Sequence, residues 1–300
     1  MNQTHNLRKR SVSDNAAIAD VSDTAFWVTH FRAVENARPN PMFQDPFAKT
    51  LAGDRGKAIA ESMPKTSRYT EWSVLARTVV IDRFIMRAIE EGIDAIINLG
   101  AGLDTRPYRM NLPPTLQWIE ADYPNIIEYK QQVLAAENPR CQLSRVAVDL
   151  ADTDARNAFF NHAAADANRV LILTEGVIPY LSPDEVATLA GDLLAQERFC
   201  YWVTEYLHSS MYRYLQEAAR GDAMKNAPFK FFPQEWYAFF AGQGWVEKET
   251  RYFGEIAREF KRKVPMPWFG RIIVPLLPAK VKKQILQSSG FVIFKRKSEQ

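Results

Sequence analysis

The chain has 300 residues, of which 47% are hydrophobic, so it can bury a substantial core as one large domain or two small ones. The formal net charge of +3 indicates no polyanionic partner, and the two cysteines, Cys141 and Cys200, are too few for a disulfide framework or a zinc site. A polar N-terminus and the lack of an apolar run of about 18 residues predict neither a signal peptide nor a membrane span, and the low cysteine count is typical of a reducing compartment, so we expect a cytoplasmic protein.

The first 92 residues are predicted to form a tail and a helical region. Residues 1–20 are polar and are expected to be flexible. From residue 21 to 92 the pattern is helical, interrupted by proline clusters at 38–41 and 45–46. Apolar residues repeat at helical spacing over Tyr69–Glu90, which predicts one long amphipathic helix that ends at Gly92. We expect residues 21–92 to cap the ligand edge of the domain that follows.

From residue 93 onward, strand and helix patterns alternate. Short apolar or alternating segments predict strands at 95–99, 116–120, 145–148, 170–174, 198–204, 245–250 and 291–295. Helical patterns lie between them at 125–136, from Ser182 onward and at 233–242. This alternation predicts a doubly wound α/β fold with a mostly parallel sheet, and we place its core at residues 93–254.

The first predicted strand runs into a glycine turn, Gly100-Ala101-Gly102. In an open α/β sheet, such a turn lets the backbone pass close beneath a ligand before the next helix begins. A dinucleotide-binding fingerprint needs a third glycine at position 105, where this chain has Thr105. The turn therefore favours an adenosine-bearing cofactor other than NAD.

Carboxylates follow the next three predicted strands, at the edge where ligands bind in this kind of sheet. Glu120 or Asp122 can accept both hydroxyl hydrogens of a ribose, and Asp149 can accept from an adenine amine. Glu175, after the fourth strand, can take an ammonium group. Taken singly, Asp122 and Asp149 fit helix caps equally well. As an ordered set, the acids describe S-adenosylmethionine (SAM), whereas NAD has no ammonium group for Glu175.

Several segments resemble the leucine carboxyl methyltransferase type of SAM-dependent methyltransferases, which includes bacterial polyketide and other small-molecule O-methyltransferases. The resemblance spans roughly residues 20–250, and it is carried by Asp23–Trp27, Arg32–Glu35, Phe43–Ala48, Arg77 with Asp82, Asn98–Arg106, Glu120–Pro124, Val148–Leu150 and Glu175–Leu181. It implies the Rossmann-like fold of class I SAM methyltransferases, with an N-terminal helical cap.

The resemblance also implies roles for individual residues in holding the cofactor. Arg77 corresponds to the arginine that holds the cofactor's carboxylate, Gly100 to the glycine at its methionine part, and Glu175 to the residue near its amino group. Gly102 belongs to the same turn. The ribose and adenine contacts correspond to Asp122, Asp149 and Leu150.

The candidate catalytic residues are Tyr180, His30 and His208. The resemblance puts Tyr180 where the family often has a tyrosine facing the transfer site, next to Pro179, which departs from the family pattern. A carboxylate acceptor needs no base, whereas a phenol or alcohol does, and His30 on the cap or His208 after the fifth strand could face it. A structural role is the alternative for both histidines. We expect no metal, because no cluster of metal-ligating residue types is present.

Residues 255–290 form a basic and apolar excursion that matches nothing in the family, ahead of a closing strand and tail at 291–300. Between Glu255 and Lys297, eleven Lys or Arg face two Glu, a local charge of +9. One interpretation is a surface insertion whose lysines are solvated. The other is a lid or docking element at 261–289 that attracts an anionic, lipophilic acceptor or makes weak contact with an anionic membrane.

Together these patterns predict a SAM-dependent O-methyltransferase whose small-molecule acceptor, polyketide-like or another secondary metabolite, offers a carboxylate, phenolic or alcohol oxygen. One alternative is a protein or peptide carboxyl methyltransferase. Another is a non-catalytic SAM-binding or RNA-associated module. No RNA-binding aromatic motif accompanies the basic region, so we expect no nucleic-acid partner. The sequence leaves the oligomeric state open.

Overall fold

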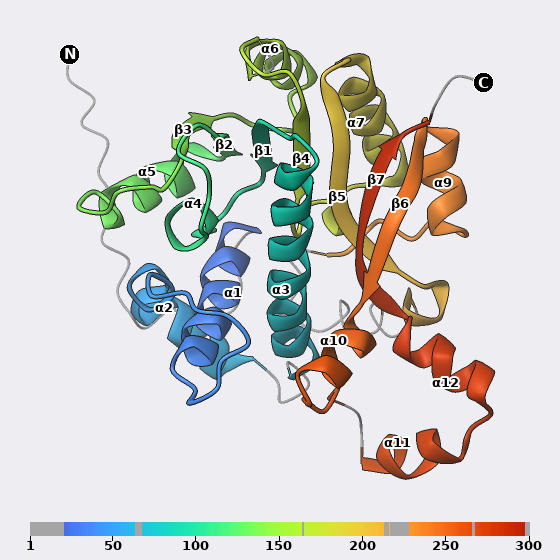
Figure 1. The fold of residues 1–300 in the computed structure, drawn as a ribbon. Coiled ribbons are helices and arrows are strands. Elements are labelled where there is room, and N and C mark those ends of the chain that lie inside the picture. The colour runs from blue at the N-terminus through green and yellow to red at the C-terminus, as the bar shows by residue number, and fades with distance from the viewer. Residues whose placement is uncertain are drawn as a thin grey trace, which may run out of the picture.

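The computed structural model describes residues 21–63, 68–163, 165–212, 216, 228–265 and 268–297; the tail predicted at 1–20 lies outside these ranges. One seven-stranded sheet with the order β3-β2-β1-β4-β5-β7-β6 organises the chain (Figure 1). The strands are β1 (Ala95–Leu99), β2 (Gln117–Asp122), β3 (Gln142–Ala147), β4 (Val170–Thr174), β5 (Phe199–Leu207), β6 (Trp245–Tyr252) and β7 (Ser289–Arg296). The first five run parallel, and β7 is antiparallel to both β5 and β6. The predicted fold class is confirmed.

The two central strands, β1 and β4, are buried along their whole length. Their side chains alternate between two cores, with Ile96 on one face of the sheet and Ile97 on the other. A strand buried on both faces takes mostly apolar residues, which is why these segments are nearly continuous apolar runs, with Asn98 and Thr174 as the polar exceptions. Because β1, β2, β4 and β5 run parallel, their carboxyl ends meet at one edge of the sheet.

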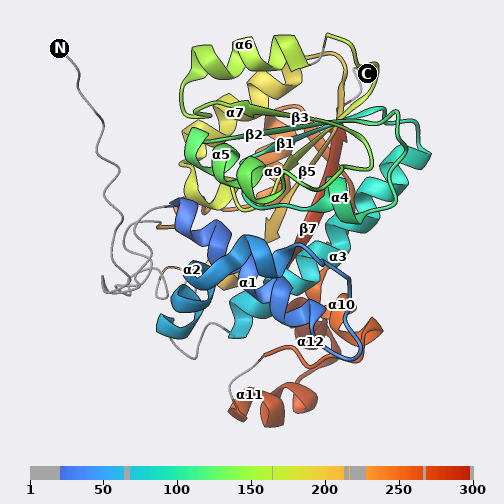
Figure 2. The ribbon, with the colours of Figure 1, turned by 90° about the vertical axis from the view of Figure 1, so that its left-hand side faces the viewer.

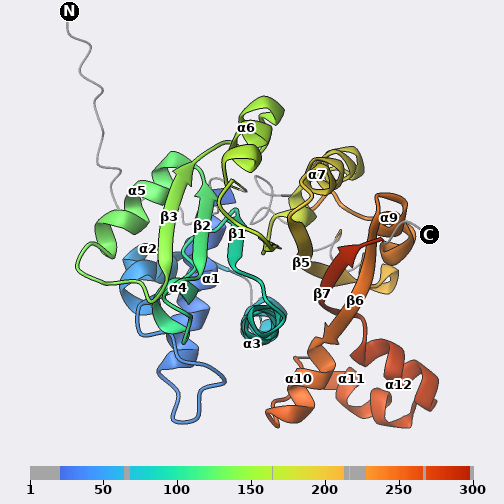
Figure 3. The same cartoon turned by 45° about the horizontal axis from the view of Figure 1, so that its top comes forward.

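Helices cover both faces of this sheet (Figure 3). On one face, α3 (Arg68–Glu90) packs Val79 and Phe84 in the same core as Ile96, together with α10 (Phe253–Glu259). On the other face, α6 (Thr153–Ala163), α7 (Pro183–Ala195) and α9 (Trp236–Gly242) share a core with Ile97. The predicted cap, residues 21–92, is therefore not a single unit, because its last helix, α3, lies on a face of the sheet and not over its edge.

The cap is formed by α1 (Val21–Asn36) and α2 (Ala48–Ser62), which pack on each other and lie beneath the sheet in Figure 2. Phe26 and Trp27 of α1 share a small core with Leu103, with Tyr108 of α4 (Arg106–Arg109) and with Ile126 of α5 (Pro124–Val133). This packing holds α1 against the loops that follow β1 and β2.

The excursion before the last strand folds into short helices. After α10 come α11 (Trp268–Ile273), the 3₁₀ turn η5 (Val274–Leu276) and α12 (Ala279–Leu286), which leads into β7. The prolines at 275 and 278 explain why the helices are short, since proline cannot donate to the preceding turn. Throughout the described ranges, every helix is too short or too polar to cross a bilayer.

Candidate cofactor and acceptor site

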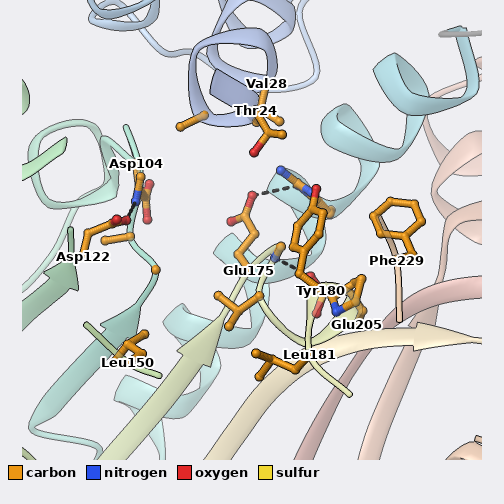
Figure 4. A pocket seen from close by; sticks show the side chains of 18 of the residues that line it. Thr24, Val28, Asp104, Asp122, Leu150, Glu175, Tyr180, Leu181, Glu205 and Phe229 are labelled. Atoms are coloured by element: carbon orange, nitrogen blue, oxygen red, sulfur yellow. Dashed lines mark hydrogen bonds and ion pairs between the residues drawn. The ribbon is translucent and has the colours of Figure 1, made fainter. Parts of the chain in front are cut away.

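A cavity of about 760 Å³ lies between α1 and the carboxyl ends of β1, β2, β4 and β5. Figure 4 shows Asp122 and Leu150 on one side of it, Glu175 in the middle, and Tyr180, Phe229 and Glu205 on the other side. This size falls within the range of about 300–1,000 Å³ that is usual for small-molecule pockets. The cavity therefore has room for a ligand that extends across several strand ends.

The glycine turn after β1 forms part of the cavity wall. Gly100 has φ +64° and Gly102 has φ +50°, a backbone region that favours glycine. A Cβ on Gly100 would also come within 2.6 Å of Val177 Cγ2, so a side chain has no room there. The turn thus brings bare backbone to the cavity, as the sequence predicts.

Asp122, the last residue of β2, holds this turn in place. One carboxylate oxygen accepts from the Gly102 N–H at 2.6 Å, and the other accepts from the Tyr123 N–H at 2.7 Å. Burial raises the pKa of Asp122 above its usual value, although both backbone hydrogen bonds oppose the shift. Each oxygen keeps a second acceptor position, so the carboxylate can still receive a diol.

Glu120 was predicted as a cofactor ligand, and the structure contradicts this. Its side chain is fully buried outside the cavity wall, 2.8 Å from Lys130 Nζ and 2.8 Å from Arg145 Nε. The reason is its position: Glu120 lies inside β2, two residues before the strand ends, and points into the protein under α5. Its role is structural, because it neutralises two buried cations.

Glu175 sits in a buried group of ion pairs at the centre of the cavity. One carboxylate oxygen lies 2.8 Å from Arg77 Nε, and the other lies 2.8 Å from Arg106 Nη1. Burial opposes the ionisation of Glu175, but Arg106 and Arg77 outweigh it and lower its pKa. Arg106 also binds Asp82 and Asp104, at 2.7 and 2.9 Å. The cavity therefore presents a positive and a negative group side by side.

Two further polar atoms of the cavity wall have no partner among the residues that the structure describes. They are the indole nitrogen of Trp27 and the amide oxygen of Asn98, both buried. A buried polar group without a hydrogen bond costs free energy. Although both residues line the cavity, neither atom has surface open to it, so these two atoms do not mark a ligand contact.

The segment after β3 contributes apolar contacts. Val148, Leu150 and Ala151 line the cavity next to Asp122. Asp149 is exposed and accepts from the Ala151 N–H at 2.9 Å, and it is not part of the cavity wall. Leu150 therefore lies in the cavity wall and Asp149 does not, and the adenine contacts of both residues stay predictions.

The far end of the cavity is aromatic. Tyr180, in the 3₁₀ turn η2 (Ile178–Tyr180), packs against Phe229 with tilted rings whose centroids are 5.3 Å apart, and Leu181 lies beside them. Burial raises the pKa of Tyr180, so its hydroxyl stays protonated at neutral pH. Tyr180 thus lies at the far end of the cavity from Asp122, and its place facing the transfer site stays a prediction.

Neither predicted histidine lines the cavity. The ring of His30 lies on α1 beside Phe31, outside the wall, and burial lowers its pKa. His208 follows β5, and its Nδ1 accepts from the Ser210 N–H at 3.1 Å, which caps the 3₁₀ turn η3 (Ser209–Met211). Neither His30 nor His208 therefore faces the cavity, as a base for an acceptor bound there would have to do.

Glu205 is the residue that the sequence analysis missed. It lies near the end of β5, is 8% exposed and lines the cavity close to Tyr180 (Figure 4). Its carboxylate accepts from the Gly176 N–H and, at 3.0 Å, from the Thr204 hydroxyl, and it forms no ion pair with any described residue. Burial raises its pKa to about 7. The repeated dipeptide Thr-Glu, at 174–175 and 204–205, is the signal that could have pointed to it.

Comparisons with known proteins agree with this geometry. The family model for leucine carboxyl methyltransferase matches residues 25–193, which is more than half of the chain. A Mycobacterium bovis protein that carries the name of an S-adenosyl-L-methionine-dependent methyltransferase is 32% identical over 192 residues, covering 59% of this chain and 61% of that protein. A Frankia alni protein of the same name is 28% identical over 271 residues, covering 86% and 95%.

Solved structures share the fold at low identity. A DUF574-family protein from Streptomyces avermitilis superposes with a TM-score of 0.54 at 14% identity, covering 91% of this chain and 97% of its own. A Thermobifida fusca protein that carries the name of a methyltransferase gives 0.53 at 15% identity, covering 93% and 95%. The chain belongs to the leucine carboxyl methyltransferase family of SAM-dependent methyltransferases.

Proposed function

We propose that this protein transfers the methyl group of SAM to an oxygen of a small, largely apolar acceptor, and that the oxygen is a hydroxyl. The observation that carries the proposal is the cavity itself, which runs from the glycine turn and Asp122 to the aromatic end with Glu205. Its volume suits a small molecule better than a polypeptide. The two free cysteines support the cytoplasmic location as part of this proposal.

The residues of one half of the cavity fit SAM. Asp122 offers a carboxylate to the ribose, and Leu150 offers an apolar surface to the adenine. Arg77 and Glu175 offer opposite charges to the carboxylate and ammonium of the amino-acid part. When bound, SAM supplies an activated methyl group on its sulfonium.

The other half of the cavity favours a hydroxyl acceptor. The protein's part in such a transfer is to align the acceptor oxygen and exclude water, for which Tyr180, Leu181 and Phe229 provide an apolar enclosure. A hydroxyl must lose its proton as it accepts the methyl group, and Glu205 is a carboxylate without a neutralising cation at this end. Its pKa of about 7 is suited to a general base at neutral pH.

A binding measurement tests the cofactor part directly. We expect calorimetry to detect binding of SAM and of its demethylated product, S-adenosylhomocysteine, and no binding of NADH. The physical reason is that the cavity pairs a ribose carboxylate with a charge pair for an amino acid, and Thr105 replaces the glycine of a dinucleotide turn. Tight NADH binding without any heat from SAM would contradict the proposed function.

A substitution at Asp122 tests the ribose contact. Asp122→Ala is expected to weaken S-adenosylhomocysteine binding by about 1–3 kcal/mol, since the ribose hydroxyls lose a charged acceptor, and Asp122→Asn should cost less. Calorimetry measures both values, and circular dichroism checks that the variants remain folded although the alanine variant lacks the Gly102 hydrogen bond. Unchanged affinity in the alanine variant would remove Asp122 from the site.

A further inference from the structure

The α11–α12 surface, which comprises Ile272, Ile273, Leu276, Val281 and the lysines 280, 282 and 283, combines exposed apolar groups with positive charge. Only six large hydrophobic side chains are classed as exposed in the described part of the chain, and four of them lie here, with Leu276 80% exposed and Ile272 60% exposed. Neither η5 nor α12 buries a single residue. Because exposed apolar groups otherwise scatter singly over a protein surface, this concentration indicates a contact site.

The charge of this surface has one sign. Residues 268–286 contain Arg271, Lys280, Lys282 and Lys283 and no acidic residue. Lys280 and Lys283 are exposed, next to the exposed Val281. Apolar side chains flanked by basic ones match the interface of an anionic bilayer, where the former enter the headgroup region and the latter meet lipid phosphates.

This charge also argues against a second copy of the chain as the partner. A symmetric contact would bring the same basic surface of both protomers together and so concentrate positive charge at the interface. No described acidic residue within 268–286 could neutralise this charge. An anionic lipid surface removes this repulsion.

The surface is joined to the wall of the cavity. At the end of α12, a Cβ on Gly254 would come within 2.5 Å of the Leu286 carbonyl oxygen, so α10 and α12 are in close backbone contact there. The cavity is lined by Phe253 on one side of this contact and by Ser289 on the other. The hydroxyl of Ser289 forms a hydrogen bond of 2.6 Å with the hydroxyl of Tyr69. In Figures 1 and 2, α11 and α12 project away from the sheet on the side of the cap.

We propose that the α11–α12 surface docks on anionic membranes and so brings the acceptor end of the cavity to a lipid surface from which an apolar acceptor can enter. The entry of an acceptor rests on the proposed methyl transfer. The docking does not, and it can be tested without cofactor or acceptor.

The test uses the full chain and flotation with two kinds of vesicles, phosphatidylcholine alone and an equimolar mixture of phosphatidylcholine and phosphatidylserine. We expect binding to the mixed vesicles, little binding to the neutral ones, and loss of binding in about 1 M salt, where the screening length falls to about 3 Å. The variant Lys280→Gln/Lys282→Gln/Lys283→Gln should bind on the order of 100-fold more weakly, because each basic residue near an anionic surface contributes about fivefold.

Leu276→Ser tests the apolar part and should weaken binding at least about tenfold, since this side chain would be buried in the headgroup region. The matched control is Lys57→Gln/Lys295→Gln/Lys297→Gln, which removes the same charge from exposed lysines elsewhere and should bind as the parent does. Calorimetry with S-adenosylhomocysteine should give unchanged affinity for all three variants, so failure of docking and failure of the proposed function remain distinguishable.

Three results would overturn the docking proposal. They are no binding to mixed vesicles by the parent protein, equal binding to neutral vesicles, and equal loss of binding in the control variant. Light scattering provides a further check: a dimer that Leu276→Ser dissociates, in a protein that binds no vesicles, would assign the surface to a second copy.

Discussion

Replacing Glu205 by Gln is expected to lower kcat for methyl transfer to a hydroxyl acceptor by about 10²- to 10⁴-fold, the usual contribution of a general base. The substitution keeps the size of the side chain and can preserve the contact with the Gly176 N–H, but it cannot take a proton. Turnover is followed as formation of S-adenosylhomocysteine with a panel of phenols and the corresponding carboxylic acids. The affinity for SAM should stay within a few-fold of the parent value, because Asp122, Arg77 and Glu175 are untouched.

The pH dependence identifies the role of Glu205 more sharply than the rate alone. Since the carboxylate form is the base, kcat/KM of the parent enzyme should rise with pH through about 7 and then level off. The Gln variant should lack this rise. His30→Ala and His208→Ala are the controls, and each should keep turnover within a few-fold, because neither ring lines the cavity. A Gln variant that keeps both the rate and the rise would contradict the assignment.

Stability should respond to the same substitution in a predictable direction. The folded-state pKa of Glu205, about 7, lies above the reference value of 4.5, so its favourable contribution is complete below pH 4.5 and is lost as the pH rises through about 7. Glutamine does not titrate and escapes this loss. The melting temperature of the Gln variant relative to the parent should therefore increase between pH 4.5 and pH 7.

The rule that puts site residues at strand ends selected several residues that line the cavity and one that does not. Placing ligands at the carboxyl ends of parallel strands identified Gly100, Asp122 and Glu175, since convergence at one edge follows from the alternating pattern. The same rule failed for Glu120 because the second strand was predicted to end there, whereas β2 continues to Asp122. It missed Glu205 because it was applied only to the first four strands, although Glu205 directly follows the predicted end of the fifth strand at Thr204, just as Glu175 follows Thr174.

Other features depend on contacts that the local pattern does not contain. The helix over 68–90 has the same amphipathic pattern whether it covers a face of the sheet or its edge, and only packing against Ile96 and its neighbours decides between the two. His30 and His208 occupy suitable segments, but the ring of His30 packs beside Phe31 and that of His208 caps η3. Similarly, the partners of Glu120 come from α5 and β3, 10 and 25 residues along the chain.

Glu120→Gln is expected to lower the free energy of unfolding by about 3–5 kcal/mol, the cost of breaking a buried ion pair from one side. Glu120 and Lys130 are both fully buried, and Arg145 is the second cation on the same carboxylate, with side-chain exposure of 10%. Glutamine leaves the Lys130 ammonium without a counter-charge in a place where burial already lowers its pKa. Urea unfolding measures the loss.

The control for this loss is Glu128→Gln, an exposed position on the same helix as Lys130, which should change the free energy of unfolding by no more than about 0.5 kcal/mol. The variant Glu120→Gln/Lys130→Met should regain part of the stability, since a buried ion pair can be replaced by apolar groups at little cost. The affinity of folded Glu120→Gln for S-adenosylhomocysteine should equal that of the parent, unlike that of Asp122→Ala. Unchanged stability combined with weakened cofactor binding would instead return Glu120 to the ribose site, because an acid that binds the cofactor and not Lys130 would show that pattern.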